Sequence, residues 1–348
     1  TEASPLSRAA KALTQPVDIA SLAAFRILFG GLLFVGFCRF MSEGWVEPLY
    51  VEPSFFFKYT GFEWVTVPPR AGLYALWSSM AALSLLVSLG LFYRLAVVLL
   101  LALFTYAQLL DVTNYLNHYQ LVILLLAFMT LMPLSGAFSL DARLRPHLRR
   151  ATLPRWMLTL LKLQVAVVYI SAGLAKATSE WLLYAQPMNI WMSARSELPI
   201  IGPLLDELWV AYGMSWAGFL YDTFIVFFLL KRRTRPYAYA VVICFHGLTG
   251  IFFDIGLFPW IMTIATTLYF DPSWPRKLLC RLGLVRLEDA HLPDFQAAEN
   301  AAHSSPSRPR IHIPILIAAY GALALLTPHR HYLYPGEVLW HEQGMRYA

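Results

Sequence analysis

The stretch VAVVYISAGLAK, residues 165–176, is an apolar run that ends in a lysine. Together with the apolar residues before it, the run approaches the roughly 20 residues that a helix needs to cross the hydrocarbon core of a bilayer. A charge in hydrocarbon is costly, so an ionisable residue at the end of such a segment is a candidate for function. The stretch therefore predicts a membrane helix with a candidate reactive amine, Lys176, at its end.

The composition places the whole chain in the membrane class. Hydrophobic residues make up 58% of the 348 positions, charged residues make up 14%, and the mean hydropathy is +0.55. Soluble domains carry about 25% charged residues. Apolar segments recur from Ala20 to Leu326 without a gap large enough for a soluble domain. We therefore expect an all-α, polytopic helical bundle.

Nine apolar segments are candidates for spanning helices, although the third, fourth, eighth and ninth are short for a full crossing. They are Ile19–Phe37, Ala71–Leu91, Leu95–Leu110, Tyr119–Leu134, Met157–Lys176, Met214–Leu230, Pro236–Phe253, Leu257–Phe270 and Ile311–Leu326.

Basic and acidic connections alternate between these segments, and this alternation decides the orientation. Arginine and lysine gather in residues 8–11, 94, 143–155, 231–235 and 276–286, whereas the intervening connections are acidic or nearly uncharged. Because basic loops stay in the cytoplasm, the amino terminus is expected inside and the carboxyl terminus outside. The predicted parts are a cytoplasmic amphipathic segment (1–18), the core membrane domain (19–270), a cytoplasmic linker (271–310), the ninth helix (311–326) and an outer tail (327–348).

Several functional classes find no support in the residues. The net charge of +6 comes from clusters between apolar segments and not from a basic patch interleaved with aromatic residues, which argues against nucleic-acid binding. Cys38, Cys244 and Cys280 have no CxxC spacing and no nearby pair of histidines, so no metal site is expected. No GxSxG, HExxH or nucleotide-binding loop occurs in a suitable context. The first 16 residues do not have the pattern of a cleavable signal peptide.

Lys176 shares a helix face with Tyr169 and Gly173, and small residues around Gly173 allow another helix to approach closely. An amine that loses its hydration there can be neutral and act as a general base. The alternative is a lysine that extends to the outer headgroups without a chemical role.

Two histidines are further candidates. His118 lies in a short polar turn in which Asn117 can orient its imidazole, and the alternative is a histidine that caps a helix start. His246 lies in the outer half of the seventh segment, where a structural hydrogen bond to a neighbouring helix is the alternative role. Arg26 and Asp222 are also within apolar segments, and we expect them to pair as a structural lock.

Several strings together resemble the vitamin K-dependent gamma-glutamyl carboxylase family, in particular its bacterial relatives and the horizontally transferred transmembrane (HTTM) domain. They are Phe25–Ile27, Asn117–Tyr119, Tyr169–Lys176, Phe245–His246 with Ile255–Phe258, Pro272–Arg276 and Leu333–Gly336. Each string is weak alone, but their order and spacing are specific, and the resemblance covers about Pro16 to Ala348.

The resemblance implies a multi-pass enzyme of the bacterial inner membrane, or of the endoplasmic reticulum membrane, with its site toward the non-cytoplasmic side. In that family a lysine takes a proton from vitamin K hydroquinone, of the phylloquinone or menaquinone type. Oxygen converts the cofactor to its epoxide through a strong base that removes a proton from a peptide glutamate, and carbon dioxide traps the carbanion. In the animal enzymes the last string leads into a large lumenal domain, whereas this sequence ends soon after that string, either as a natural short form or because the sequence is cut. Recognition of a glutamate-containing protein substrate is therefore in doubt.

On this resemblance Lys176 is the expected base, and His118 with Asn117 is expected to orient the oxygen species. His246 and Tyr169 are expected to line the quinol pocket, together with aromatic walls from Trp181, Phe253 and Trp260. Two other hypotheses remain: a non-catalytic quinone or lipid carrier that keeps the pocket, and a membrane scaffold in which the polar residues only tie helices together.

Overall fold

Helices dominate the part of the chain that the structure describes, and two compact units divide the chain. The computed structural model describes residues 4–253, 255–284 and 311–333. Unit 1 comprises Thr1–Leu161 and Phe270–Pro314, and unit 2 comprises Lys162–Tyr269 and Ile315–Ala348. The expected helical class is confirmed, with one short two-stranded sheet as an exception. The polar part of the predicted linker, 288–310, and the tail from residue 334 lie outside the described residues.

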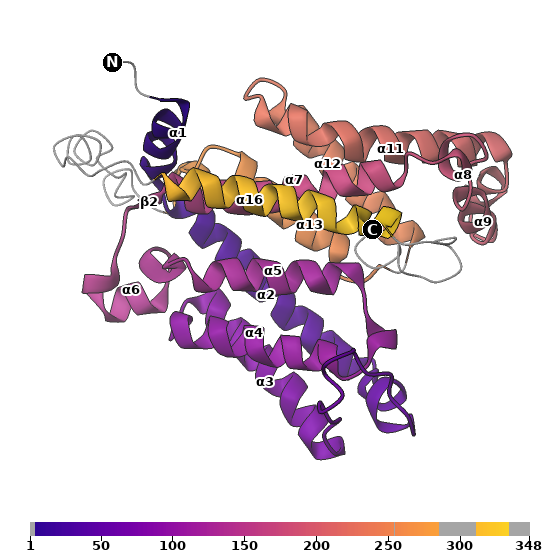
Figure 1. The fold of residues 1–348 in the computed structure, drawn as a ribbon, viewed down its shortest axis with the longest axis horizontal. Helices are drawn as coiled ribbons and strands as arrows, with labels where there is room; N and C mark the ends of the chain where they lie inside the picture. Colours follow the sequence, from indigo (N-terminus) through magenta and orange to yellow (C-terminus); the bar gives the residue numbers. More distant parts are fainter. Residues whose placement is uncertain (1–3, 254, 285–310, 334–348) are drawn as a thin grey trace. The chain divides into compact units, whose positions relative to one another are not determined.

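In unit 1, four consecutive long helices pack in chain order, α2 against α3, α3 against α4 and α4 against α5 (Figure 1). The short connections between α3 and α4 (residues 90–92) and between α4 and α5 (residues 110–116) favour antiparallel neighbours. The helices are α1 (Pro5–Thr14), α2 (Ala20–Ser42), α3 (Arg70–Leu89), α4 (Tyr93–Leu109), α5 (Asn117–Thr130), α6 (Leu140–Leu144) and α14 (Trp274–Arg281). Single turns lie at η1 (Glu47–Val51), η2 (Val112–Asn114), η3 (Leu134–Gly136) and η4 (Pro146–Leu148).

Arg26 occupies the core of unit 1, where its side chain is fully buried. Its guanidinium donates hydrogen bonds to the carbonyl oxygens of Val87 at 2.7 Å, Ser88 at 2.5 Å and Phe138 at 2.5 Å. The last carbonyl groups of a helix have no partner within the helix, and α3 ends there at Gly90 in the left-handed conformation, with a φ of 63°. The predicted Arg26–Asp222 pair is therefore wrong, because Arg26 caps the end of α3.

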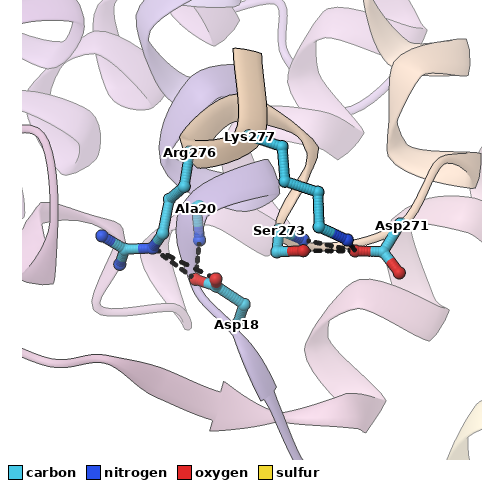
Figure 2. Close-up of polar contacts among 6 residues, drawn as sticks. All are labelled: Asp18, Ala20, Asp271, Ser273, Arg276 and Lys277. Carbon is cyan, nitrogen blue, oxygen red and sulfur yellow. Dashed lines mark hydrogen bonds and ion pairs between the residues drawn. The ribbon is translucent and has the colours of Figure 1, made fainter. Parts of the chain in front are cut away.

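A small sheet and an ion pair fix the start of α2 (Figure 2). Strand β1 (Pro16–Asp18) pairs antiparallel with β2 (Thr152–Pro154). The Asp18 carboxylate accepts hydrogen bonds from the backbone N–H of Ala20 at 2.8 Å and from the Arg276 Nε at 3.1 Å. These contacts join residues that are 258 positions apart in the sequence, so they hold α14 to the first long helix.

A second polar cluster lies beside this ion pair, at the start of α14 (Figure 2). The Asp271 carboxylate accepts hydrogen bonds from the Ser273 backbone N–H at 3.0 Å and from the Lys277 Nζ at 3.1 Å. Residues Pro272–Arg276, one of the strings that resemble the family, thus connect α14 to the start of α2 in unit 1.

Unit 2 is arranged around α11 (Leu208–Leu230), which packs with α8, α9, α10 and α12 (Figure 1). The other helices are the main part of α7 (Arg155–Ala175), α8 (Ser179–Leu182), α9 (Met188–Ser193), α10 (Gly202–Leu205), α12 (Arg235–Phe252), α13 (Phe258–Thr266) and most of α16 (His312–Leu326), with single turns η5 (Thr267–Tyr269) and η6 (Thr327–Leu333). The long loop that follows α7 thus folds into three short helices before α11 begins.

Close approach of α7 and α11 depends on Gly173. A Cβ atom at this position would lie 2.6 Å from the Thr223 Oγ1 and 2.9 Å from the Thr223 backbone nitrogen. Such distances are too short for any residue but glycine, so the small residue lets the two backbones meet. The predicted helix contact at Gly173 is confirmed.

Four helices in the described ranges are long and apolar enough to cross a membrane, namely α2, α3, α7 and α11. Three shorter apolar helices, α4, α5 and α16, have between 10 and 17 residues. These features identify a membrane protein. The count of nine spans and the placement of the termini stay predictions, because α12 and α13 belong to neither group.

Candidate functional site

Lys176 follows the last residue of α7 and points toward α11. Its ammonium Nζ lies 2.8 Å from the Asp222 Oδ2 and donates a second hydrogen bond, at 3.2 Å, to the Ala172 carbonyl oxygen. The Lys176 side chain is 21% exposed and the Asp222 side chain is 8% exposed. The alternative of a lysine that merely extends to headgroups therefore does not describe this side chain, which is held by a buried carboxylate.

The position of Asp222 follows from the helix contact described above. Asp222 is next to Thr223, whose backbone meets Gly173, and Lys176 is three residues beyond Gly173 on the same face of the chain. A close backbone contact at Gly173 thus brings the amine and the carboxylate together. The sequence placed Asp222 within a spanning segment but assigned it the wrong partner.

Trp181 covers the amine from α8. The Lys176 Nζ lies 5.2 Å from the centre of the Trp181 ring, which is within the range of a cation–π contact. The indole Nε1 donates a hydrogen bond of 2.8 Å to the Ser215 carbonyl oxygen, and the Thr178 hydroxyl accepts from the Trp181 backbone N–H. These bonds fix the ring against α11, so Trp181 lies beside Lys176 in the structure.

Tyr169 and His246 belong to a buried polar chain in the same unit. The Tyr169 hydroxyl lies 3.0 Å from the His246 Nε2, accepts a hydrogen bond from the Tyr221 hydroxyl at 3.2 Å and lies 3.4 Å from the Thr266 Oγ1. Tyr169 is 1% exposed and His246 is 3% exposed. Sequence spacing predicted that Tyr169 and Lys176 share a face of α7. The sequence patterns did not identify Tyr221 as a member of this polar chain, although Tyr221 is next to Asp222. They also did not identify Thr266, because no motif or spacing distinguishes this residue.

Four buried polar atoms among the described residues of unit 2 have no hydrogen-bond partner: the Ser171 Oγ, the Gln186 Oε1, the Ser215 Oγ and the His246 Nδ1. Buried polar groups are nearly always hydrogen-bonded, so each such atom calls for an explanation such as a water or a ligand. Ser171, Ser215 and His246 lie on α7, α11 and α12, the helices that also carry the buried polar chain of Tyr169, Tyr221 and His246. The unit therefore offers free hydrogen-bonding capacity for a polar ligand group.

The other aromatic candidates divide into two environments. Phe253 ends α12 and packs edge-to-face on Trp191, with ring centres 5.6 Å apart. Together with Trp181, Phe253 borders an apolar cluster of Met188, Met192, Leu205 and Phe252. Trp260, on α13, is 60% exposed and does not belong to that cluster.

His118 and Asn117 begin α5 and belong to unit 1. The His118 ring packs edge-to-face on Tyr119, with centres 4.6 Å apart. Asp111 caps the turn before them through a hydrogen bond from the Thr113 backbone N–H. Their predicted role beside Lys176, which is in unit 2, stays a prediction.

Unit 1 also contains a cavity of about 430 Å³ beside β1 and α14. It is lined by Gln15, Pro16, Val17, Asp18, Arg155, Asp271, Pro272, Ser273 and Lys277, and none of the predicted site residues is among them. Within the described ranges, no group of three histidine, cysteine or acidic residues is arranged to hold a metal ion.

Comparison with known families identifies the fold to which these helices belong. Residues 14–274, more than half of the chain, match the HTTM domain. The chain belongs to the HTTM domain family. This is the domain of the vitamin K-dependent gamma-carboxylase family, so the resemblance found in the sequence strings is confirmed at the level of the family. No solved structure matches the chain.

The HTTM match covers the helices that carry every candidate residue. It begins just before β1 and ends at the first residue of α14, so it includes His118, the Lys176–Asp222 pair and the polar chain at His246. The match shows common ancestry with the carboxylase family, whereas the activity must be argued from the site.

Proposed function

We propose that this HTTM-domain protein is a membrane enzyme that oxidises vitamin K hydroquinone with oxygen and carboxylates a glutamate side chain with carbon dioxide. The observation that carries the proposal is the Lys176 amine at the end of α7, enclosed by Asp222 and the Trp181 ring. An amine held in a largely water-excluded place is suited to proton transfer with a weakly acidic ligand. The family assignment makes a hydroquinone the first ligand to consider.

The residues around Lys176 fit such a ligand in their chemistry. A hydroquinone presents an apolar ring and two hydroxyl groups, so it needs aromatic neighbours and a few hydrogen-bonding atoms. Unit 2 supplies the Trp181 ring and the apolar cluster next to it, and it supplies the unpaired His246 Nδ1 and Ser171 Oγ. We therefore assign the quinol to unit 2, with Tyr169, His246, Trp181, Phe253 and Trp260 as the lining residues.

Lys176 acts as the base in this proposal. Reduced vitamin K supplies the electrons for reduction of oxygen, and its conversion to the epoxide drives removal of the glutamate γ proton that carbon dioxide replaces. The phenolic hydroxyl and the lysine amine have ordinary pKa values of about 10 and 10.4, so a proton can move between them at little cost. His118 with Asn117 orients the oxygen species in the same proposal.

The enzyme works from the non-cytoplasmic side of a bacterial inner membrane or an endoplasmic reticulum membrane, with quinol delivered by the lipid phase. The basic connections support this orientation. A peptide or protein glutamate is the proposed second substrate.

Purified protein in lipid vesicles tests the proposal when it is supplied with vitamin K hydroquinone, oxygen and bicarbonate. We expect the epoxide to appear by mass spectrometry, and a glutamate-containing peptide to gain the mass of carbon dioxide. Heat-inactivated protein in the same vesicles is the control for spontaneous oxidation of the hydroquinone. Epoxide formation no faster than in this control contradicts the proposal.

A quinone carrier without catalysis is the second candidate, and the ion pair favours it. An amine that is paired with Asp222 must lose a proton before it can act as a base, whereas binding alone has no such requirement. The carrier hypothesis predicts saturable quenching of tryptophan fluorescence by menaquinone, weaker in Trp181→Phe than in the wild type, without any epoxide. Quenching that accompanies epoxide formation favours the enzyme.

A further inference from the structure

The Lys176–Asp222 pair is the closest contact between charged groups in unit 2 among the described residues. The carboxylate reaches the ammonium at 2.8 Å, the Ala172 carbonyl oxygen accepts a second hydrogen bond, and the Trp181 ring lies on a further side. All three neighbours favour a positive charge on the nitrogen. From the sequence we expected an amine that loses its hydration and can be neutral, and the structure adds a carboxylate beside it.

Among the described residues, the other titratable groups on the elements packed here do not contact the amine. Tyr169 on α7, Tyr221 on α11 and His246 on α12 bond to one another. Glu180 on α8 is exposed and accepts a hydrogen bond from Ser179. Among the described residues, Asp222 is thus the titratable group that contacts the Lys176 amine.

We propose that Asp222 is a positioning residue that holds Lys176 as an ammonium ion and thereby sets the pH above which this lysine becomes a base and a nucleophile. Above that pH the ammonium gives its proton to solvent, and the nitrogen lone pair that remains can accept a proton from a ligand hydroxyl. The catalytic role of the deprotonated lysine rests on the proposed function, whereas the effect of Asp222 on the amine does not. The state of the amine itself can be measured without any quinol.

Acylation of the full-length protein in detergent measures that state, because acetic anhydride reacts with a neutral amine and not with an ammonium ion. Brief acetylation at a series of pH values, followed by mass spectrometry of peptides containing Lys176, gives the pH of half-maximal modification. Asp222→Asn and Asp222→Thr each remove the carboxylate, and the second variant serves if the first does not fold. Asp222→Glu keeps the carboxylate, and Ser215→Ala, a buried change on the same helix, is the matched control.

We expect the half-maximal pH of Lys176 acetylation to fall by about 1 to 3 pH units in Asp222→Asn and Asp222→Thr, since an opposite charge at this distance stabilises the charged form by that amount. Asp222→Glu and Ser215→Ala should keep the wild-type value. Neutral variants that elute as folded protein in size-exclusion chromatography and yet acetylate with the wild-type profile would overturn the inference and leave Asp222 as a structural tie.

Activity supplies a second readout that separates the two proposals. If the vesicle assay yields epoxide, the acidic limb of its pH–rate profile should move to lower pH in Asp222→Asn by the same amount as acetylation. If the assay yields no epoxide while acetylation shifts as expected, the proposed function fails and the role of Asp222 stands. If epoxide forms but neither profile moves, the role of Asp222 fails and the proposed function stands.

Discussion

Arg26 and Lys176 show two ways in which single residues of this chain keep a cation inside apolar helices. Arg26 is satisfied by carbonyl oxygens at the ends of helices and needs no acidic partner. Lys176 instead takes a carboxylate from the neighbouring helix. A guanidinium has five donors in a fixed fork, which suits several carbonyl groups, whereas an ammonium is a compact charge suited to one close anion. The first arrangement is structural, and the second leaves a proton that can be exchanged.

Replacing Arg26 with methionine tests the first arrangement. Arg26→Met removes the donor from the carbonyl oxygens of Ser88 and Phe138, whereas Val87 keeps the Gly90 N–H, so the protein should lose at least about 2 kcal/mol of stability. Thermal unfolding in detergent, followed by tryptophan fluorescence, measures the change. Arg94→Met is the control, because Arg94 also donates to a carbonyl oxygen, that of Thr130, but in an exposed position. Equal losses in the two variants would contradict this account of Arg26.

At the scale of helices, the contact between α7 and α11 decides which residues form the site. Gly173 lets the two backbones meet, and the register of this contact places Lys176 opposite Asp222. The sequence predicted α7 as Met157–Lys176, close to the observed Arg155–Ala175, because a long apolar segment with small residues is a strong local signal. It could not predict the partner of Lys176, since the register between helices depends on packing 46 residues away in the sequence.

Gly173→Ala tests the helix contact. The added methyl group would lie 2.9 Å from the Thr223 backbone nitrogen, so the helices must separate, and we expect a loss of about 1–3 kcal/mol. Gly247→Ala is the matched control in α12, because nothing lies within 4 Å of a Cβ atom there. That variant should be neutral or up to about 1 kcal/mol more stable, because alanine favours a helix over glycine. Thermal unfolding of both variants compares them, and a Gly173→Ala protein as stable as Gly247→Ala would contradict the close approach.

At the scale of the whole molecule, the sequence predicted the fold class and the family, which are confirmed, and also a number of membrane spans and an orientation that the structure does not test. Composition alone identified a helical membrane protein, because membrane spans are set by length and hydropathy. The family strings identified the HTTM domain, because their order along the chain is specific. The number of spans depends on how short or interrupted helices such as α13 sit in lipid. Asn117 and His118 lie in the first unit and the lysine pair in the second, so their joint role is still an expectation.

Cysteine labelling tests the proposed orientation. In a variant without Cys38, Cys244 and Cys280, we expect Glu180→Cys to react with a membrane-impermeant maleimide from outside intact cells. Lys231→Cys, at the other end of α11, should react only after the cells are permeabilised, because basic connections remain inside. The reverse pattern would place the amino terminus outside and move the site to the cytoplasmic face.

Epoxide formation by wild-type protein and Lys176→Ala, side by side in the same vesicles with vitamin K hydroquinone and oxygen, is the most direct measurement of the central claim. We predict that the wild type produces the epoxide and that the variant loses at least about 100-fold in rate, the low end of a general base's contribution, while it still binds the quinol. A Lys176→Ala protein that makes epoxide at the wild-type rate would contradict the account.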